Sequence, residues 1–346
     1  MNITNISMTS SRSPTMSSAG SLNFAAILKG EIVLEPSGTG SRFFSLRRYL
    51  RGRFGCRVAR IPLDGGLGCP NRDGALSSQG CIFCNEKGSG TGAAGAGLTV
   101  AEQLEQGLQR LGRRAERFMA YFQAFTNTYA PPERLKGLWD QALTSDRVVG
   151  LAVATRPDCL EEEALALLSG YAESREVWLE LGLQSASDKT LALINRGHTA
   201  ADFARAIERS RGRGLKLVAH IILGLPGEGE AEMDRTAAFL GELGLDGVKI
   251  HSLYICRDTA LAGLYAAGRY ACLGREEYVQ RAVHFLEHLP PDMVIHRLTG
   301  DPAPDELVAP DWSRNKQQTL RSIRERLAKL DTWQGRRLGA PRPNPR

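Results

Sequence analysis

The sequence predicts an α/β fold of six βα units with a short helical extension at the C-terminus. From residue 57 onward, short β-rich runs alternate with segments of helical periodicity, and the 346 residues are ample for one such domain. The first β-rich run is followed by a stretch of Gly, Pro and Cys that is too long for an ordinary connection. Alternating strands and helices indicate a parallel sheet, and a long loop on such a sheet is where function is expected.

The first strand is expected at 57–63 and the long loop at 64–97. Thr99 then begins a helix, because Glu102 three residues later completes a capping box. One face of this helix is apolar, formed by Val100, Leu104, Leu108 and Leu111.

Five further strands, each followed by a helical pattern, are centred on Tyr121–Ala124, Gly150–Val153, Trp178–Leu181, Val218–Ile222 and Lys249–Leu253. Six parallel units can form an open doubly wound sheet or an incomplete barrel, and the spacing of the elements does not separate the two. In both folds the site lies at the C-terminal ends of the strands.

Three regions are expected along the chain. Residues 1–40 are interpreted as a disordered N-terminal extension or the product of a start codon assigned too early, and residues 41–300 as the core domain. Residues 301–346 form a basic C-terminal extension with a helix from about Ser313 to Leu330.

The composition is that of a soluble globular protein, with 42% hydrophobic and 24% charged residues and no apolar run long enough for a membrane span. The net charge of +6 is unevenly placed: seven arginines lie between 42 and 60 without an acid, and ten Lys/Arg lie in 311–346 against three acids. The middle of the chain is therefore acidic. The basic flanks form either a surface for phosphate groups, as in nucleic-acid binding, or solvated ends, and the sequence leaves both readings open.

Seven cysteines in a chain without a secretory signal suggest metal binding in a reducing cytoplasm rather than a disulfide framework. Cys69, Cys81 and Cys84 form a close trio, with eleven and two residues between them. Three thiolates on one loop can hold a [4Fe–4S] cluster with one open iron, whereas zinc usually needs a fourth Cys or His. A zinc site and three structural cysteines remain as alternatives. The four other cysteines have no neighbour at ligand spacing, although a second cluster using Cys159, Cys256 or Cys272 stays open.

The trio, with Phe83 before its last cysteine, resembles the cluster loop of the radical S-adenosylmethionine superfamily, where three and two residues usually separate the cysteines. The longer first gap resembles the branch that includes the elongator catalytic subunit. Other segments similar to that branch are Ala154–Asp158, Leu179–Ser185, Ile194–Thr199, His220–Gly227, Val248–His251 and Gly268–Tyr270. The runs Cys69–Gly74 and Thr155–Cys159 look more like the smaller YhcC/YtqA-like group. No acetyltransferase-like second domain is visible, so the resemblance does not extend to acetyl transfer.

This resemblance implies an incomplete (β/α)6 TIM-like barrel, with Cys69, Cys81 and Cys84 holding a [4Fe–4S] cluster that binds S-adenosylmethionine. It implies reductive cleavage of S-adenosylmethionine to a 5′-deoxyadenosyl radical, with an electron from a low-potential donor of the flavodoxin or ferredoxin type. Residues carried over as S-adenosylmethionine contacts are Phe83 near adenine, Gln123 and Thr126 near the methionine amino group, and Thr155, Arg156, Gln184 and His220 around the ribose and carboxylate.

No catalytic residue is assigned at this stage, but the polar side chains proposed to touch the substrate are Arg196, His198, His251, His296 and Arg297. The alternative for any one of them is a buried polar group that is satisfied by the fold. The resemblance and the basic flanks favour modification of a tRNA base, a uridine. The alternatives are radical chemistry on a small metabolite and a zinc-stabilised, non-catalytic RNA-binding protein.

Overall fold

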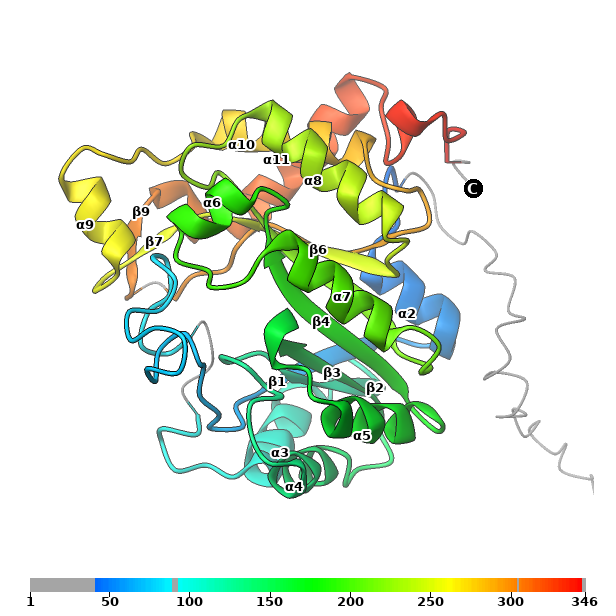
Figure 1. Ribbon diagram of the computed structural model, residues 1–346. Helices are drawn as coiled ribbons and strands as arrows, with labels where there is room; N and C mark the ends of the chain where they lie inside the picture. Colours follow the sequence, from blue (N-terminus) through cyan, green and yellow to red (C-terminus); the bar gives the residue numbers. More distant parts are fainter. Residues whose placement is uncertain (1–40, 89–92, 304, 344–346) are drawn as a thin grey trace, which may run out of the picture. The chain divides into compact units, whose positions relative to one another are not determined.

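The computed structural model describes residues 41–88, 93–303 and 305–343, and the predicted extension at 1–40 lies outside this part. Within it, seven parallel strands form one curled sheet in the order β1-β2-β3-β4-β5-β6-β8 (Figure 1). The strands are β1 (Val58–Leu63), β2 (Arg117–Phe122), β3 (Val148–Thr155), β4 (Glu176–Gln184), β5 (Lys216–Leu223), β6 (Gly247–Ser252) and β8 (Val294–Leu298). The predicted α/β class and incomplete barrel are confirmed.

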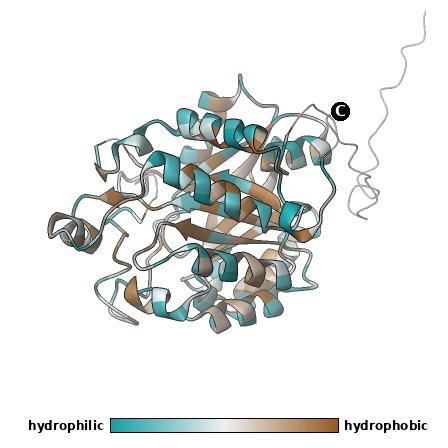
Figure 2. Ribbon diagram, turned by 90° about the horizontal axis from the view of Figure 1, so that it is seen from above, coloured by the Kyte–Doolittle hydropathy of each residue, from teal (hydrophilic) through white to brown (hydrophobic). Residues whose placement is uncertain are grey.

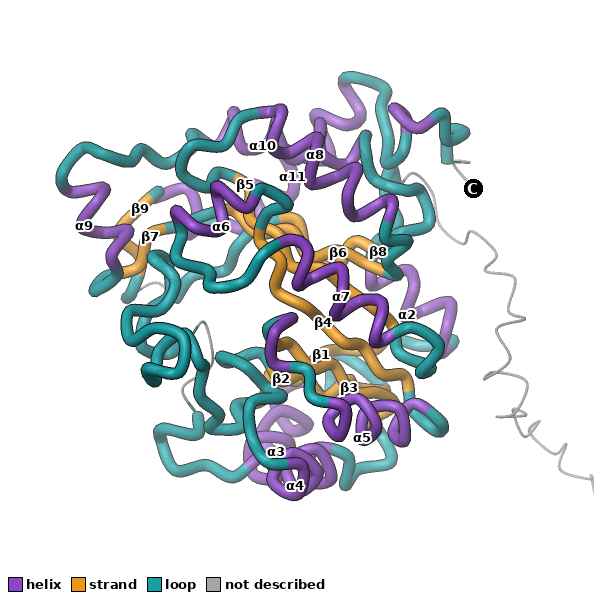
Figure 3. Tube along the Cα trace, in the orientation of Figure 1, coloured by secondary structure: helices purple, strands orange, loops and turns teal. Residues whose placement is uncertain are grey.

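Helices connect and surround the strands, and Figure 3 shows the strands grouped at the centre. The α-helices are α2 (Leu46–Phe54), α3 (Val100–Leu111), α4 (Pro132–Ala142), α5 (Glu162–Ala172), α6 (Asp188–Leu193), α7 (Ala200–Ser210), α8 (Glu230–Glu242), α9 (Ala260–Ala266), α10 (Arg275–Glu287) and α11 (Lys316–Lys329). Short elements complete the chain: β7 (Ile255–Cys256) pairs with β9 (Leu307–Ala309), and 3-10 turns lie at Pro157–Cys159, Asp311–Arg314 and Arg336–Leu338. In Figure 2 the helices are largely hydrophilic around a more hydrophobic sheet. None of the described helices combines the length and the apolar character that crossing a bilayer requires.

The seventh strand, β8, corrects the prediction of six. It is short and follows Pro290 and Pro291, and its apolar run is interrupted by His296 and Arg297, so the sequence gives only a weak strand signal there. In the structure β8 pairs with β6 and ends the sheet. The backbone N–H of Ile295 also donates to the Phe44 carbonyl at 2.7 Å, so the segment before α2 lies along the outer edge of β8.

Close packing fixes α3 against β1. The predicted capping box of Thr99 and Glu102 is present at the start of α3. On the inner face of this helix, a Cβ added to Gly107 would lie 2.3 Å from Cγ2 of Ile61 on β1. A side chain at this position would force the helix off the sheet, so the glycine permits the contact.

The C-terminal segment packs on the barrel, and its helix begins and ends close to the predicted bounds. Ile323 and Leu327 of α11 are fully buried in the main hydrophobic core. The Gln334 side chain accepts from the Phe44 backbone N–H at 2.9 Å and donates to the Met293 carbonyl at 2.8 Å. The end of the chain is thereby tied to the segment beside β8.

Candidate active site

The three motif cysteines lie on the loop between β1 and α3. Backbone hydrogen bonds shape this loop: the Arg72 N–H donates to the Cys69 carbonyl at 2.9 Å, and the Cys84 N–H donates to the Cys81 carbonyl at 3.0 Å. Gly80, immediately before Cys81, has a φ of +73°, a left-handed conformation that glycine adopts without strain. The Arg72 side chain crosses the loop and donates to the Asn85 carbonyl at 2.9 Å, so the loop is closed around it.

A second segment, which follows α6, holds this loop against the barrel. The Ile82 N–H donates to the Ile194 carbonyl at 3.1 Å, and the Asn195 side chain donates to the Gly80 carbonyl at 2.7 Å. In return the Asn71 side chain donates to the Asn195 carbonyl at 2.6 Å. Asn195 is itself left-handed, with a φ of +53°, which asparagine tolerates better than most residues. The side-chain amides of Asn71 and Asn195 therefore hold the cysteine loop and this segment together.

The cysteine loop forms one wall of a cavity of about 770 Å³ at the C-terminal ends of the strands. All three motif cysteines line this cavity. So do all seven residues carried over from the family resemblance, which are Phe83, Gln123, Thr126, Thr155, Arg156, Gln184 and His220. The fold brings these ten side chains to one space.

Two of the carried-over residues are held by polar partners beside the cavity. The guanidinium of Arg156 binds both carboxylate oxygens of Asp158, at 2.9 and 2.7 Å, and the hydroxyls of Thr155 and Thr128 lie 2.7 Å apart. Gln184 has a φ of +76° next to a register shift at the end of β4. A non-glycine residue in this region of backbone space is strained, and such strain concentrates at functional sites.

Comparisons with known proteins agree with this geometry. Residues 66–240, which contain the cysteine loop and the four strands β2 to β5, match the model of the Radical SAM superfamily, and residues 245–329 match the Radical SAM C-terminal domain. The chain belongs to the radical SAM superfamily. Protein YhcC of Escherichia coli K12 is 41% identical over 293 residues, 84% of this chain and 94% of that protein. YtqA of Bacillus subtilis is 37% identical over 302 residues, 87% of this chain and 94% of that protein.

A solved structure shows a similar fold. An archaeal Elp3 from Methanocaldococcus infernus superposes with a TM-score of 0.63 at 16% identity, over 80% of this chain and 64% of that chain. Members of this superfamily are enzymes that use a [4Fe–4S] cluster and S-adenosylmethionine, so this radical SAM protein takes the same cofactors.

The donor set around the cysteines fits a cluster with three protein ligands. Among the described residues, no fourth cysteine lines the cavity. Burial, and then the neighbouring Cys81, raise the pKa of the Cys84 thiol to about 11, and such a thiol ionises when it coordinates a metal. The Asn71 amide lies 3.5 Å and the Arg196 guanidinium 3.6 Å from the Cys81 sulfur. Hydrogen-bond donors that point at a cysteine sulfur stabilise its negatively charged thiolate form, which is the form that binds a metal.

The cavity wall offers a polar group to which S-adenosylmethionine can bind. The hydroxyl of Thr126 is buried on the cavity wall, and within the described residues it has no hydrogen-bond partner. A buried hydroxyl without a partner is costly, so a polar ligand group at this place would stabilise it. This observation fits the cofactor set that the radical SAM family uses.

A cluster of charged and polar side chains lies inside the barrel, and it includes His220, one of the carried-over residues. The carboxylate of Glu180 on β4 is fully buried and lies 2.8 Å from Arg60, 2.7 Å from His220, 3.3 Å from Lys249 and 3.4 Å from His296. The hydroxyl of Tyr121 bonds to the Lys249 ammonium. We call this set the floor cluster; its members are Arg60, Tyr121, Glu180, His220, Lys249 and His296.

Electrostatics in the floor cluster are set by burial and by close charge. Burial alone would raise the pKa of Glu180, but Arg60 and Lys249 hold it well below its usual range. Burial lowers the pKa of Lys249 to about 7, although Glu180 opposes the shift. Burial and then Lys249 lower the pKa of His220 to about 4. At neutral pH the cluster therefore contains an ionised Glu180, a charged Arg60 and a neutral His220.

A β-bulge interrupts the pairing of β8 with β6 beside the cavity. Val248 is aligned with Ile295, but the next residue, Lys249, is aligned with Arg297, so one extra residue is inserted at His296. Successive side chains of a regular strand point to opposite faces, and a bulge re-aims one of them. His296 and Arg297 both line the cavity, together with the flanking residues Ile295 and Leu298.

Of the five residues proposed at first to touch the substrate, Arg196, His251, His296 and Arg297 line the cavity. His198 does not line it. Its Nε2 lies 3.0 Å from the Gly182 carbonyl, and burial, then Arg196, lower its pKa to about 3. A neutral His198 that supports the backbone of β4 accounts for this position.

The sequence reasoning did not assign roles to Arg60, Tyr121, Glu180 and Lys249. Three of them, Arg60, Glu180 and Lys249, could have been identified from the sequence. Each is a charged residue with an apolar residue on both sides, within a predicted strand. Both faces of a parallel barrel strand are covered, so an isolated charge there must point into the barrel or meet a buried partner.

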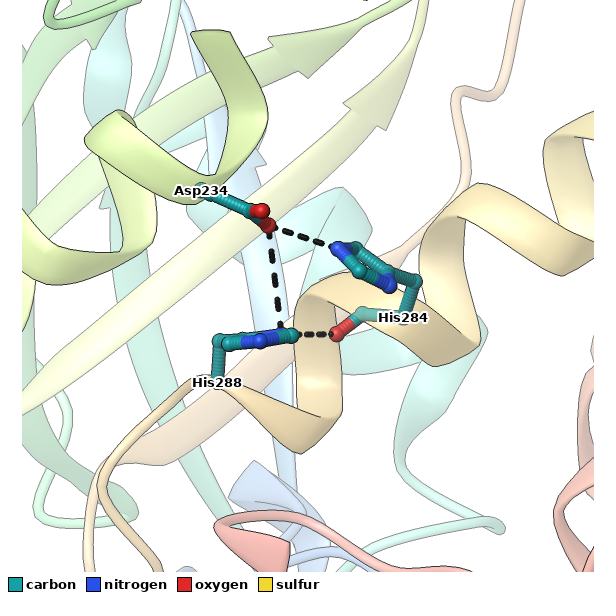
Figure 4. A group of neighbouring side chains, drawn as sticks. All are labelled: Asp234, His284 and His288. Carbon is teal, nitrogen blue, oxygen red and sulfur yellow. Dashed lines mark hydrogen bonds and ion pairs between the residues drawn. The ribbon is translucent and has the colours of Figure 1, made fainter. Parts of the chain in front are cut away.

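A separate polar group lies on the outer side of the barrel. His284 lies in the last turn of α10 and His288 directly follows that helix, and Figure 4 shows both rings turned toward Asp234 of α8. The Nε2 of His284 lies 2.6 Å from the carboxylate, and the Nδ1 of His288 lies 4.0 Å from it and 2.8 Å from the His284 carbonyl. The three side chains are half-buried and join α8 to α10.

Proposed function

We propose that this radical SAM enzyme modifies a base of tRNA, a uridine. The observation that supports the proposal best is the charge of the cavity wall. Among the described residues that line it, the only carboxylate is Asp301, and it pairs with Lys316 at 2.5 Å. The nine lysines and arginines of the wall are Arg47, Arg60, Arg72, Arg156, Arg196, Lys249, Arg297, Lys316 and Arg324. A cleft lined by one sign of charge attracts substrates of the opposite sign.

The cations run from the cysteines to the surface. Arg72 and Arg196 lie against the cysteine loop and suit the negative charge of a thiolate-bound cluster. At the other end, Arg47 of α2 and Arg324 of α11 are exposed, and in the part of the chain that the structure describes neither has a recorded ion pair. These two arginines come from the two basic flanks of the sequence and are placed to meet phosphate groups of an RNA whose base enters the cavity.

The cofactors supply reductive cleavage of S-adenosylmethionine and with it a species that abstracts hydrogen from the substrate. In the proposed arrangement Cys69, Cys81 and Cys84 hold the cluster, and Thr155, Arg156, Gln184 and His220 bind the nucleoside and carboxylate of S-adenosylmethionine. Phe83 packs on the adenine, and Gln123 and Thr126 receive the amino group. The surrounding barrel excludes water from the reacting atoms.

The electron is proposed to come from a low-potential flavodoxin or ferredoxin. We place the reaction in the cytoplasm, because all seven cysteines are free and a reducing compartment preserves both thiols and low-potential clusters.

Two double variants test the RNA part of the proposal. Arg47→Gln/Arg324→Gln removes two charges from the cavity wall, whereas Arg51→Gln/Arg321→Gln removes two exposed charges from the same helices, away from that wall. The first pair is expected to weaken tRNA binding at least about tenfold and to lower the slope of log K against log salt by about 2. The second pair should change both much less. Filter binding with unmodified tRNA at several salt concentrations measures both quantities.

Equal losses in the two double variants would mean that tRNA binds through general surface charge, and no binding by the wild type would remove tRNA as the substrate. Mass spectrometry of tRNA nucleosides from a strain that lacks the protein gives an independent answer. An altered uridine supports the proposal, while an unchanged nucleoside profile with altered small metabolites favours the alternative of a small-molecule substrate.

A further inference from the structure

The buried carboxylate of the floor cluster already has two cations beside it. One oxygen of Glu180 faces Arg60 at 2.8 Å, and the other faces His220 at 2.7 Å and Lys249 at 3.3 Å. Arg60 also donates to Nδ1 of His296 at 2.6 Å, which requires His296 to be neutral. Burial and then Arg60 lower the pKa of His296 to about 3, in agreement with this hydrogen bond. Glu180 is therefore balanced by Arg60 and Lys249.

Arg297 is an additional cation beside this balanced group. It follows the register shift at His296, lines the cavity and is half-buried. Within residues 41–88, 93–303 and 305–343, no hydrogen bond or ion pair of its guanidinium is recorded. Asp301, the one acid among the described residues of the wall, pairs with Lys316. A half-buried guanidinium with no counter-charge is unfavourable unless a ligand provides one.

A second unpartnered group lies in the same region. The Nε2 of His251 on β6 is buried, and among the described residues it has no hydrogen-bond partner. The His251 ring lies 5.5 Å from that of His220, and both residues line the cavity. Lys249, two residues before His251 on β6, is aligned with Arg297, and burial and then Arg297 hold the pKa of His251 well below its usual range.

We infer that Arg297, with Lys249 and His251 beside it, forms a subsite for an oxyanion of the substrate, a carboxylate or a phosphate. The inference rests on the proposed function in one respect, that the cavity is where the substrate binds. A guanidinium presents parallel N–H donors that match the two oxygens of such a group, and the neutral ring adds one further hydrogen bond. The oxyanion supplies the counter-charge that the wall does not provide. The same chemistry could belong to a phosphate of the nucleotide that enters the cavity or to a carboxylate of a small second substrate.

Calorimetric titration of the protein, reconstituted with its cluster and saturated with S-adenosylmethionine, separates these sources. The probes are uridine, uridine 5′-monophosphate, inorganic phosphate and acetate. Tighter binding of the monophosphate than of uridine assigns the subsite to a nucleotide phosphate, and binding of acetate assigns it to a carboxylate. In either case Arg297→Gln is expected to weaken binding of the anion about tenfold or more, with uridine unaffected.

Two further variants keep the result interpretable. Arg110→Gln removes the same charge from the exposed end of α3, outside the cavity, and should bind each anion as the wild type does. Arg297→Lys keeps the charge but loses the paired donors, so its affinity should lie between those of the wild type and Arg297→Gln. If the anions bind wild type and Arg297→Gln equally, or if none binds the wild type, the inference is wrong. Formation of 5′-deoxyadenosine by the wild type is measured separately, so a failure of this subsite is distinguishable from a failure of the proposed radical function.

Discussion

Replacing Cys84 with alanine is expected to abolish the formation of 5′-deoxyadenosine. The variant keeps two cysteines on the loop, which is one fewer than a cluster with three protein ligands needs. Cys84 is half-buried and lines the cavity together with Cys69 and Cys81, and no fourth cysteine lines the described cavity wall. The measurement is anaerobic reconstitution with iron and sulfide, followed by dithionite and S-adenosylmethionine, with 5′-deoxyadenosine quantified by chromatography.

Cys272→Ala is the matched control. Cys272 is a half-buried free cysteine that packs among apolar residues and does not line the cavity. This variant should hold about four irons per chain and cleave S-adenosylmethionine at the wild-type rate. A wild-type protein that takes up one zinc and produces no 5′-deoxyadenosine would instead support the non-catalytic, zinc-stabilised alternative. Cleavage by Cys84→Ala would show that the cluster ligands are assigned wrongly.

The cysteine loop and the strand ends were predictable because their signals are local. The spacing of Cys69, Cys81 and Cys84 is visible in the sequence, and the resemblance around them named seven further residues that the fold places on one cavity. Their individual roles remain proposals. The alternation of strand and helix also predicted six of the seven strands.

The floor cluster was not predictable in the same way. Alternation along a strand separates two faces but does not say which face is the interior, and in a parallel barrel both are apolar. Arg60 was counted with the basic flank, because it follows six other arginines in the run from residue 42. The bulge at His296 arises from pairing between β6 and β8, which are far apart in the chain, so neither the strand nor the position of Arg297 follows from local sequence.

Replacing Glu180 with glutamine is expected to destabilise the protein by about 3–5 kcal/mol, the usual cost of removing one partner of a buried ion pair. The side chain keeps its shape but loses the charge that Arg60 and Lys249 face at 2.8 and 3.3 Å. Such a loss is a large part of the ~5–15 kcal/mol by which domains are stable. Unfolding in urea, followed by circular dichroism, measures it. Glu105→Gln, at an exposed position of α3, is the control and should change the free energy of unfolding by less than about 0.5 kcal/mol.

Two tests separate the effect of charge from that of shape. Adding Lys249→Met to Glu180→Gln removes one of the stranded cations and should restore part of the lost stability, which a purely steric defect would not allow. The pH dependence gives the second test. Because the pKa of Glu180 is held well below its usual range, its contribution is fully present above the pKa of the unfolded chain, about 4.3. The contribution is lost as the pH falls through the folded pKa, where the wild type becomes neutral like the variant. The difference in stability should therefore shrink as the pH falls below about 4.3, whereas a difference that does not shrink at acid pH would assign the effect to packing.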